Sequence, residues 1–212
     1  MSGVAFTEEM RGHACFGEGD FARGHAEGRE SDTELMFHLT IEIPDAADLA
    51  ADAPATGWVG CHALGGRREV ERGVFNCFVD AADPDARKNM LYRLWFSDGV
   101  GRPLTLAGFK VIADGGALDV WPDTSTLYTR VRRGHLEAHE DEGAELVAAG
   151  ILHIRKRDFA RQLTTFRGRG DMRGDRAAAL ARFNMGFAGQ LWDVYGGSGA
   201  VRRRRARQVT PG

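Results

Sequence analysis

Glu8 is the first candidate for acid–base chemistry, and it lies in an alternating stretch near the start of the chain. Val4, Phe6 and Met10 alternate with polar residues and predict a strand near 4–11. In this alternation Glu8 points the same way as the apolar side chains. A carboxylate in an apolar interior favours its neutral form unless a cation pairs with it, which suits a general acid or base. The alternatives are an ion pair with an arginine at the rim of the fold, or a strand that ends earlier.

Lys110 is the second candidate, inside a predicted strand near 104–113. The chain uses arginine for nearly all its positive charge, and its lysines are Lys88, Lys110 and Lys156. Both faces of this strand are apolar, so the alternation does not settle where Lys110 points. A buried ion-pair partner, an anion ligand and a solvated lysine all remain open. We hypothesise that Glu8, Lys110 or Tyr92 supplies proton transfer or hydrogen bonds to a substrate.

A dense polar and aromatic cluster follows at Asp119, Trp121, Asp123, Thr124 and Tyr128. Two carboxylates four residues apart around a Trp-Pro could receive a divalent cation or orient a ligand. The favoured interpretation is a tight turn in which Asp123 and Thr124 bond the backbone and Trp121 covers the core.

Apolar and aromatic side chains share one face of each of two predicted strands, near 67–79 and 89–97. Such stripes are ordinarily core. The interior of an eight-stranded barrel, however, is just wide enough for one small ligand, and barrel mouths are common binding sites. The predicted ligand-binding residues are Phe75, Met90, Tyr92, Leu94, Phe96, Trp121 and Tyr128.

Metal and cofactor chemistry has little support in the sequence. His135 and His139 have helical metal-ligand spacing, but they lack the HExxH pattern and lie in a predicted acidic loop. We therefore predict no metal site and no cofactor. The arginine-rich stretch 202–207 could touch phosphate or acidic lipid. A solvated, disordered basic tail over 198–212 is the favoured interpretation.

Composition and charge describe a globular protein of 212 residues and 23.2 kDa. A net charge of −2 argues against a nucleic-acid surface, which is normally strongly basic. No apolar run approaches the roughly 20 residues of a membrane span, and the N-terminus lacks the basic and apolar regions of a secretory signal. Cys15, Cys61 and Cys77 have no CxxC spacing, so reduced cysteines and a cytoplasmic location are expected.

Turn-forming residues separate a series of short alternating segments, of which the clearest runs over 35–43 and stops at Pro44. We predict a long loop from Gly12 to Asp32 and one helix over about 176–195. The fold class is all-β: an antiparallel barrel (lipocalin-like) or a sandwich of about eight or nine strands with this C-terminal helix, forming a single domain over 1–197. The other predicted strands lie near 56–63, 67–79, 89–97, 104–113, 124–134, 145–155 and 158–167.

Several ordered strings are similar to an accessory region of large bacterial proteins that join a GMC-type, cholesterol-oxidase-like flavin oxidoreductase to an α/β-hydrolase domain. Together they cover most of residues 4–195. The matching strings are Phe6–Gly12, Gly73–Asn76, Tyr92–Gly101, Leu106–Lys110, Trp121–Tyr128 and Phe183–Trp192.

This resemblance covers the accessory region alone. The chain has no flavin-binding GxGxxG after a first strand and no GxSxG nucleophile elbow. The resemblance implies sterol- or acyl-like substrates nearby, and a flavin oxidoreductase or a hydrolase as a partner. We therefore expect the barrel to bind a hydrophobic small molecule of sterol, acyl or polyketide type. The alternatives are an isomerase or cyclase in the same cavity, and a non-catalytic docking module.

Overall fold

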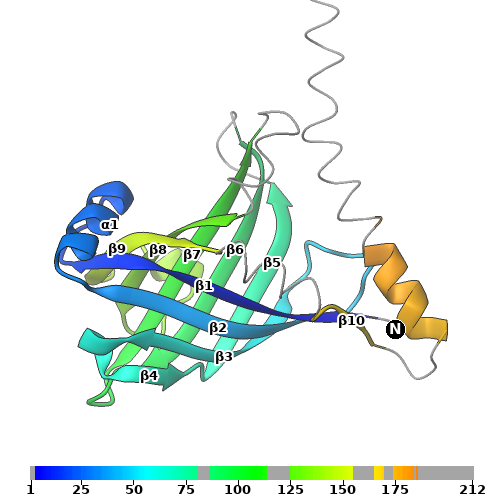
Figure 1. Cartoon of the computed structure of the whole chain (residues 1–212), viewed down its shortest axis with the longest axis horizontal. Coiled ribbons are helices and arrows are strands. Elements are labelled where there is room, and N and C mark those ends of the chain that lie inside the picture. Colours follow the sequence, from blue (N-terminus) through cyan, green and yellow to red (C-terminus); the bar gives the residue numbers. More distant parts are fainter. Residues whose placement is uncertain are drawn as a thin grey trace, which may run out of the picture.

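The computed structural model describes residues 3–80, 86–113, 125–154, 165–169, 174–183 and 185. In this part of the chain the sheet is antiparallel and runs in the order β10-β1-β2-β3-β5-β6-β7-β8-β9, and β4 pairs with β3 (Figure 1). The elements are β1 (Val4–Phe16), α1 (Phe21–Glu30), β2 (Glu34–Ile43), β3 (Ala53–Cys61), η1 (His62–Leu64), β4 (Gly66–Glu69), β5 (Arg72–Asp80), β6 (Ala86–Ser97), β7 (Pro103–Ala113), β8 (Thr126–Arg133), η2 (Ala138–Glu140), β9 (Leu146–His153) and β10 (Arg167–Gly168).

Closure of the sheet makes an eight-stranded antiparallel barrel, which confirms the predicted all-β class and selects the barrel over the sandwich. The second half of β1 pairs with β9, with Ala14 opposite Gly150. The first half of β1 instead meets β10, with Val4 opposite Gly168. One long strand therefore closes the barrel along half its length and leaves the other half to the C-terminal segment.

Strict alternation in β1 and β2 divides the inside of the barrel from the outside. Inward residues of β1 are buried at every second position as far as Ala14. On the neighbouring β2, the inward Phe37 lies opposite Met10 and Leu39 lies opposite Glu8. The 35–43 strand is therefore confirmed, and it ends at Ile43 before Pro44. The inner face carries the hydrophobic core.

The loop predicted from Gly12 to Asp32 is wrong, because this stretch contains the end of β1 and the whole of α1. Asp20 caps the helix by accepting a hydrogen bond from the backbone N–H of Arg23 at 2.8 Å. Gly24 and Gly28 lower the helix propensity but let the helix lie against the strands. A Cβ at Gly28 would lie 2.6 Å from the Ala14 carbonyl oxygen, and one at Gly24 would collide with that of Ala149.

The C-terminal helix covers one end of the barrel (Figure 1). Residues 174–183 are helical, so the helix predicted over 176–195 is present where the structure describes it. Phe183 is buried against the core, and its ring lies 6.5 Å from that of the inward Phe6. Phe166 stacks on Phe6 at 4.8 Å between ring centroids. The cover is therefore held by an aromatic cluster as well as by the backbone pairing of β10 with β1.

Other differences from the sequence-based expectations are local. The strand predicted over 67–79 is two strands, β4 and β5, separated at Val70 and Glu71. Most of the strand predicted over 158–167, the continuation of the helix to 195 and the tail over 198–212 lie outside the described residues. Within the described part, no helix combines the length and apolar character that a membrane crossing requires.

Candidate functional site

Glu8, Tyr92 and Lys110 meet inside the barrel, although they come from three different strands. Glu8 lies on β1, Tyr92 on β6 and Lys110 on β7, all at inward positions. Their side chains are almost fully enclosed, with 2% of Glu8, 3% of Tyr92 and 2% of Lys110 exposed. The residues that the sequence suggested for acid–base chemistry are thus brought together at one site.

The Glu8 carboxylate is the centre of this cluster because each of its oxygens accepts one hydrogen bond. Lys110 Nζ donates to Oε1 at 2.7 Å, and the Tyr92 hydroxyl donates to Oε2 at 2.7 Å. Lys110 Nζ also lies 5.1 Å from the centroid of the Tyr92 ring, within cation–π range. The open question over the direction of Lys110 is settled: the lysine points inward and forms a buried ion pair.

Apolar walls surround these polar groups and shift the pKa of the neighbouring groups. Burial raises the pKa of Tyr92 well above its ordinary value, and the negative charge of Glu8 raises it further. Burial likewise raises the pKa of the Cys77 thiol. The rings of Phe37 and Phe75 lie 5.7 Å and 4.9 Å from the Tyr92 ring. Tyr92 is therefore held as a neutral hydroxyl in a water-poor site.

The cluster could also donate hydrogen bonds to a bound molecule and exchange a proton with it. An ammonium carries three N–H donors, and Glu8 is the hydrogen-bond partner of Lys110 among the described residues. A carbonyl or carboxylate oxygen on a bound molecule could accept the remaining donors. Glu8 is within reach to exchange a proton with such a molecule or with the Tyr92 hydroxyl.

The other predicted ligand-binding residues divide between two sides of the wall. Phe75, Met90, Leu94 and Phe96 are buried in the core on the inner face, as Tyr92 is. Tyr128 lies on the outer face instead, where its ring stacks on Phe109 with 5.4 Å between centroids. Trp121 lies outside the described residues, as does the rest of the 119–124 string.

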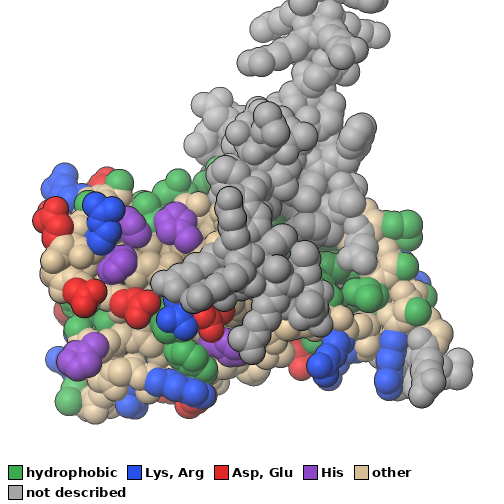
Figure 2. Space-filling model, in the orientation of Figure 1, with side chains coloured by type: hydrophobic (Ala, Val, Ile, Leu, Met, Phe, Trp, Pro, Cys, Tyr) green, Lys and Arg blue, Asp and Glu red, His purple; other side chains and the backbone are tan. Residues whose placement is uncertain are grey.

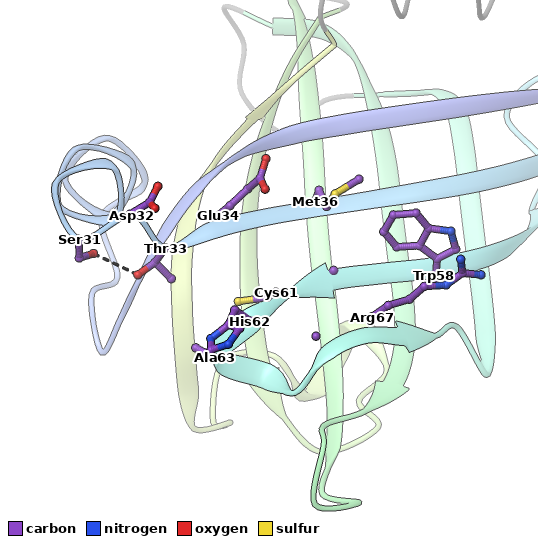
Figure 3. A pocket seen from close by; sticks show the side chains of 12 residues that line it. Ser31, Asp32, Thr33, Glu34, Met36, Trp58, Cys61, His62, Ala63 and Arg67 are labelled. Carbon is purple, nitrogen blue, oxygen red and sulfur yellow. Dashed lines mark hydrogen bonds between the residues drawn. The ribbon is translucent and has the colours of Figure 1, made fainter.

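Two grooves lined by described residues lie on the outside of the barrel, at positions that the sequence did not suggest. One groove of about 550 Å³ runs between the end of α1 and the β2–β3–β4 edge (Figure 3). In it the Ser31 and Thr33 hydroxyls hydrogen bond at 3.1 Å, and the Arg67 guanidinium lies 4.8 Å from the Trp58 ring centroid.

A second outer groove, of about 740 Å³, lies over β5, β6, β7 and β8. Its charged lining includes the carboxylates of Asp52, Glu137, Asp141 and Glu142 as well as the guanidinium groups of Arg93, Arg130 and Arg132. Sequence reasoning missed the arginines because arginines alternating with apolar residues are typical of a solvated strand face. The signal for a covered face was present in β7, whose outward residues include Ala107 and Phe109 rather than charged groups.

Histidine side chains gather beside α1 on one face of the molecule (Figure 2). The His25 ring lies 5.7 Å from both the His13 ring and the His153 ring. Burial lowers the pKa of His153, and the charge of His25 lowers it further. Within the described ranges, no group of three or more His, Cys, Asp or Glu side chains has the geometry to hold a metal ion.

No protein-family model, curated protein or solved structure matches this chain. The similarity to the accessory region of GMC-type oxidoreductase–hydrolase fusions therefore remains a prediction from the quoted strings.

Proposed function

We propose that the barrel binds a hydrophobic small molecule of sterol, acyl or polyketide type in its interior, as an accessory to an oxidoreductase or hydrolase. The observation that carries the proposal is the enclosed cluster of Glu8, Tyr92 and Lys110 within an apolar wall. The cluster would hold the one polar group of such a molecule, and the surrounding aromatic rings would contact its body.

The energetics of buried charge favour a functional role for this cluster. Taking two charged groups out of water costs several kcal/mol per ion, and replacing a buried pair by apolar residues is often neutral or stabilising. An ionisable cluster in an otherwise apolar interior is therefore a poor way to stabilise a barrel and a common feature of functional sites. Lys110, whose ammonium has N–H groups beyond the one that it donates to Glu8, would donate to a carbonyl or hydroxyl oxygen of the ligand.

Entry to the interior would pass the aromatic cover at the β10 end. Phe166 and Phe183 belong to segments that follow the last barrel strand, and they contact Phe6 on the inner face. β10 also pairs with β1, and the Arg169 N–H donates to the Gly3 carbonyl at 2.7 Å, so opening this end would require the segment to separate from β1. The ligand body would then replace ring contacts that the cover makes now.

Native mass spectrometry of the protein purified from a bacterial host tests binding directly. We expect a bound mass of a few hundred daltons that is lost on denaturation and that organic extraction identifies as a lipid or sterol. Lys110→Met should lower the bound fraction, and Arg67→Met, on the outer groove of Figure 3, should not. A protein that carries no ligand and takes up none from a sterol and fatty-acid mixture would contradict the proposal.

The hydrogen bond between Tyr92 and Glu8 favours one second candidate, a proton-transfer isomerase or cyclase in the same site. Lys110, or Tyr92 once its hydroxyl turns from Glu8 to the substrate, would polarise a carbonyl oxygen, while Glu8 would take a proton from the adjacent carbon and return it to another carbon of the same molecule. Reactant and product would then be isomers, and no other reagent would be consumed.

Deuterium exchange separates this catalyst from a carrier. A bound carbonyl compound incubated with the protein in D₂O should gain deuterium at the carbon next to the carbonyl. Glu8→Gln keeps the size of the side chain but removes its basicity, so exchange should stop while binding continues. If the unmodified protein bound the compound without exchanging its hydrogen, the catalytic candidate would be contradicted and only the carrier function would remain.

A further inference from the structure

The larger outer groove has an apolar strip on its floor. Leu91, Phe109 and Tyr128 form one cross-strand row over β6, β7 and β8 on the outside of the barrel. Leu91 is 37% exposed, which is unusual among the large apolar residues that the structure describes. Phe21 of α1 adds a wall to this strip, because its ring lies 5.6 Å from those of Phe109 and Tyr128.

A cationic strip lies directly beside the apolar one. Arg93, Ala107 and Arg130 form the next cross-strand row, and Arg132 lies in the row after that, opposite Thr105. Rows of outward residues are separated by two positions along a strand, or about 7 Å. Ala107 is the small residue between two arginines, so the floor is hollow where the cationic strip begins.

Two of these arginines are fixed by groups of the protein itself. Arg93 makes a two-pronged contact with the Asp141 carboxylate, at 3.0 and 2.5 Å. Arg130 donates to the Gly19 carbonyl at 3.0 Å and lies 4.2 Å from the Phe21 ring centroid. Neither the carbonyl nor the ring neutralises a charge, so Arg130 remains a net cation within the described part of the chain.

Arg132, by contrast, has a hydrogen-bond donor without a partner among the described residues. Its Nε is buried, and no described group accepts a hydrogen bond from it. Burial lowers the pKa of Arg132; Asp141 opposes this, while the positive charges of Arg130 and Arg93 add to it. A partly desolvated guanidinium with one unpaired N–H, beside the cationic Arg130 and the Arg93–Asp141 pair, is stabilised by an anion that reaches it.

We propose that this groove binds a small amphiphilic carboxylate, with its head on Arg132 and Arg130 and its acyl or aryl body on the strip of Leu91 and Phe109. The guanidinium fork matches a carboxylate in geometry as well as in charge. The volume of about 740 Å³ falls within the usual range of small-molecule sites. The site is separate from the barrel interior and does not depend on the function proposed for it.

Calorimetric titration of the full chain with sodium decanoate tests the groove. We expect saturable binding at one site. Arg132→Gln should weaken it by about tenfold or more, the value of one hydrogen bond between charged groups. Ala107→Leu should also weaken it, because the larger side chain fills the hollow. Arg67→Gln, in the other outer groove, should leave the affinity unchanged, and 1-decanol should bind at least about tenfold more weakly than decanoate.

Each outcome decides for or against the groove. Circular dichroism must first show that Arg132→Gln is folded, which its outward position predicts. Equal affinity of Arg132→Gln and the unmodified protein, or no saturable decanoate binding, would overturn the proposal. Weakening by Lys110→Met but not by Arg132→Gln would also overturn it, and would assign decanoate to the barrel interior instead.

Discussion

The barrel interior and the larger outer groove both place cations beside aromatic rings, but they treat those cations differently. Inside, Lys110 pairs with Glu8, both side chains are 2% exposed, and Tyr92 completes the carboxylate. Outside, Arg132 has a buried Nε with no acceptor among the described residues. Every polar group of the interior cluster has a partner, whereas in the groove, which carries both arginines and carboxylates, one guanidinium N–H has none among the described residues.

Access to water explains the difference. A charge enclosed by the barrel cannot be hydrated, so folding must supply its partner. A charge on the floor of a groove keeps part of its hydration, so it does not need a partner from the protein when no ligand is bound. Changes to the interior cluster should therefore act mainly on stability, and changes to the outer groove mainly on binding.

Removing one member of the interior pair should have the largest effect. Glu8→Leu leaves the Lys110 ammonium buried without a counter-charge, which costs about 3–5 kcal/mol of the free energy of unfolding. Urea denaturation measures it. The triple variant Glu8→Leu, Lys110→Met, Tyr92→Phe removes every charged and hydroxyl group of the cluster and should recover most of that loss. A single-variant cost below about 1 kcal/mol would mean that the pair is hydrated, as on an open surface.

Adding a side chain where α1 contacts the barrel wall should have the next largest effect on stability. Gly24→Ala places a methyl group against the Ala149 backbone and should cost about 1–3 kcal/mol, because either the helix or β9 must move. This sign is opposite to helix propensity, which favours alanine over glycine. Ala26→Gly, on the exposed side of α1, is the matched control and should follow propensity alone. If Gly24→Ala instead raised the free energy of unfolding by about as much as Ala26→Gly lowers it, both variants would follow helix propensity, and the helix would not be in close contact with β9.

The interior cluster shows what alternation in a sequence can and cannot predict. Alternation placed Glu8 on the inner face because its neighbours Phe6 and Met10 are apolar. It could not pair Glu8 with Tyr92 and Lys110, which are 84 and 102 residues away along the chain. Their meeting depends on the stagger of strands around the closed barrel. The direction of each side chain is local information, and the partner is not.

The region from Gly12 to Glu30 was misread for a related reason. Gly24 and Gly28 weaken the local helix signal, and they are present because the helix must approach two strands closely. The outer groove was missed because its arginines resemble a solvated face, and only the apolar outward residues of β7 contradict that interpretation. In both places tertiary packing overrides a pattern that is misleading when each element is considered alone.

The burial of Tyr92 in the interior cluster should make the protein less stable at alkaline pH. The pKa of Tyr92 is raised in the folded protein, whereas an unfolded tyrosine ionises near pH 10. Above about pH 10 the unfolded chain has released a proton that the folded one keeps, so stability falls as pH rises, by at most about 1.4 kcal/mol per pH unit. Urea denaturation from pH 8 to 11 should show a shallower fall for Tyr92→Phe. Identical slopes would mean that Tyr92 ionises freely.

The smallest effect on the free energy of unfolding is expected at Arg132. Arg132→Met keeps the long side chain on the groove floor but removes the unpaired buried Nε, so stability should rise by about 0.5–1 kcal/mol. Arg67→Met is the matched control. Arg67 is exposed, pairs with Glu69 at 3.0 Å and lies over Trp58, so its loss should lower stability by a few tenths of a kcal/mol. A gain at Arg132 together with lost decanoate binding would show that the groove keeps a costly charge for a ligand. A loss of stability there would mean that the guanidinium already has a partner in the folded chain.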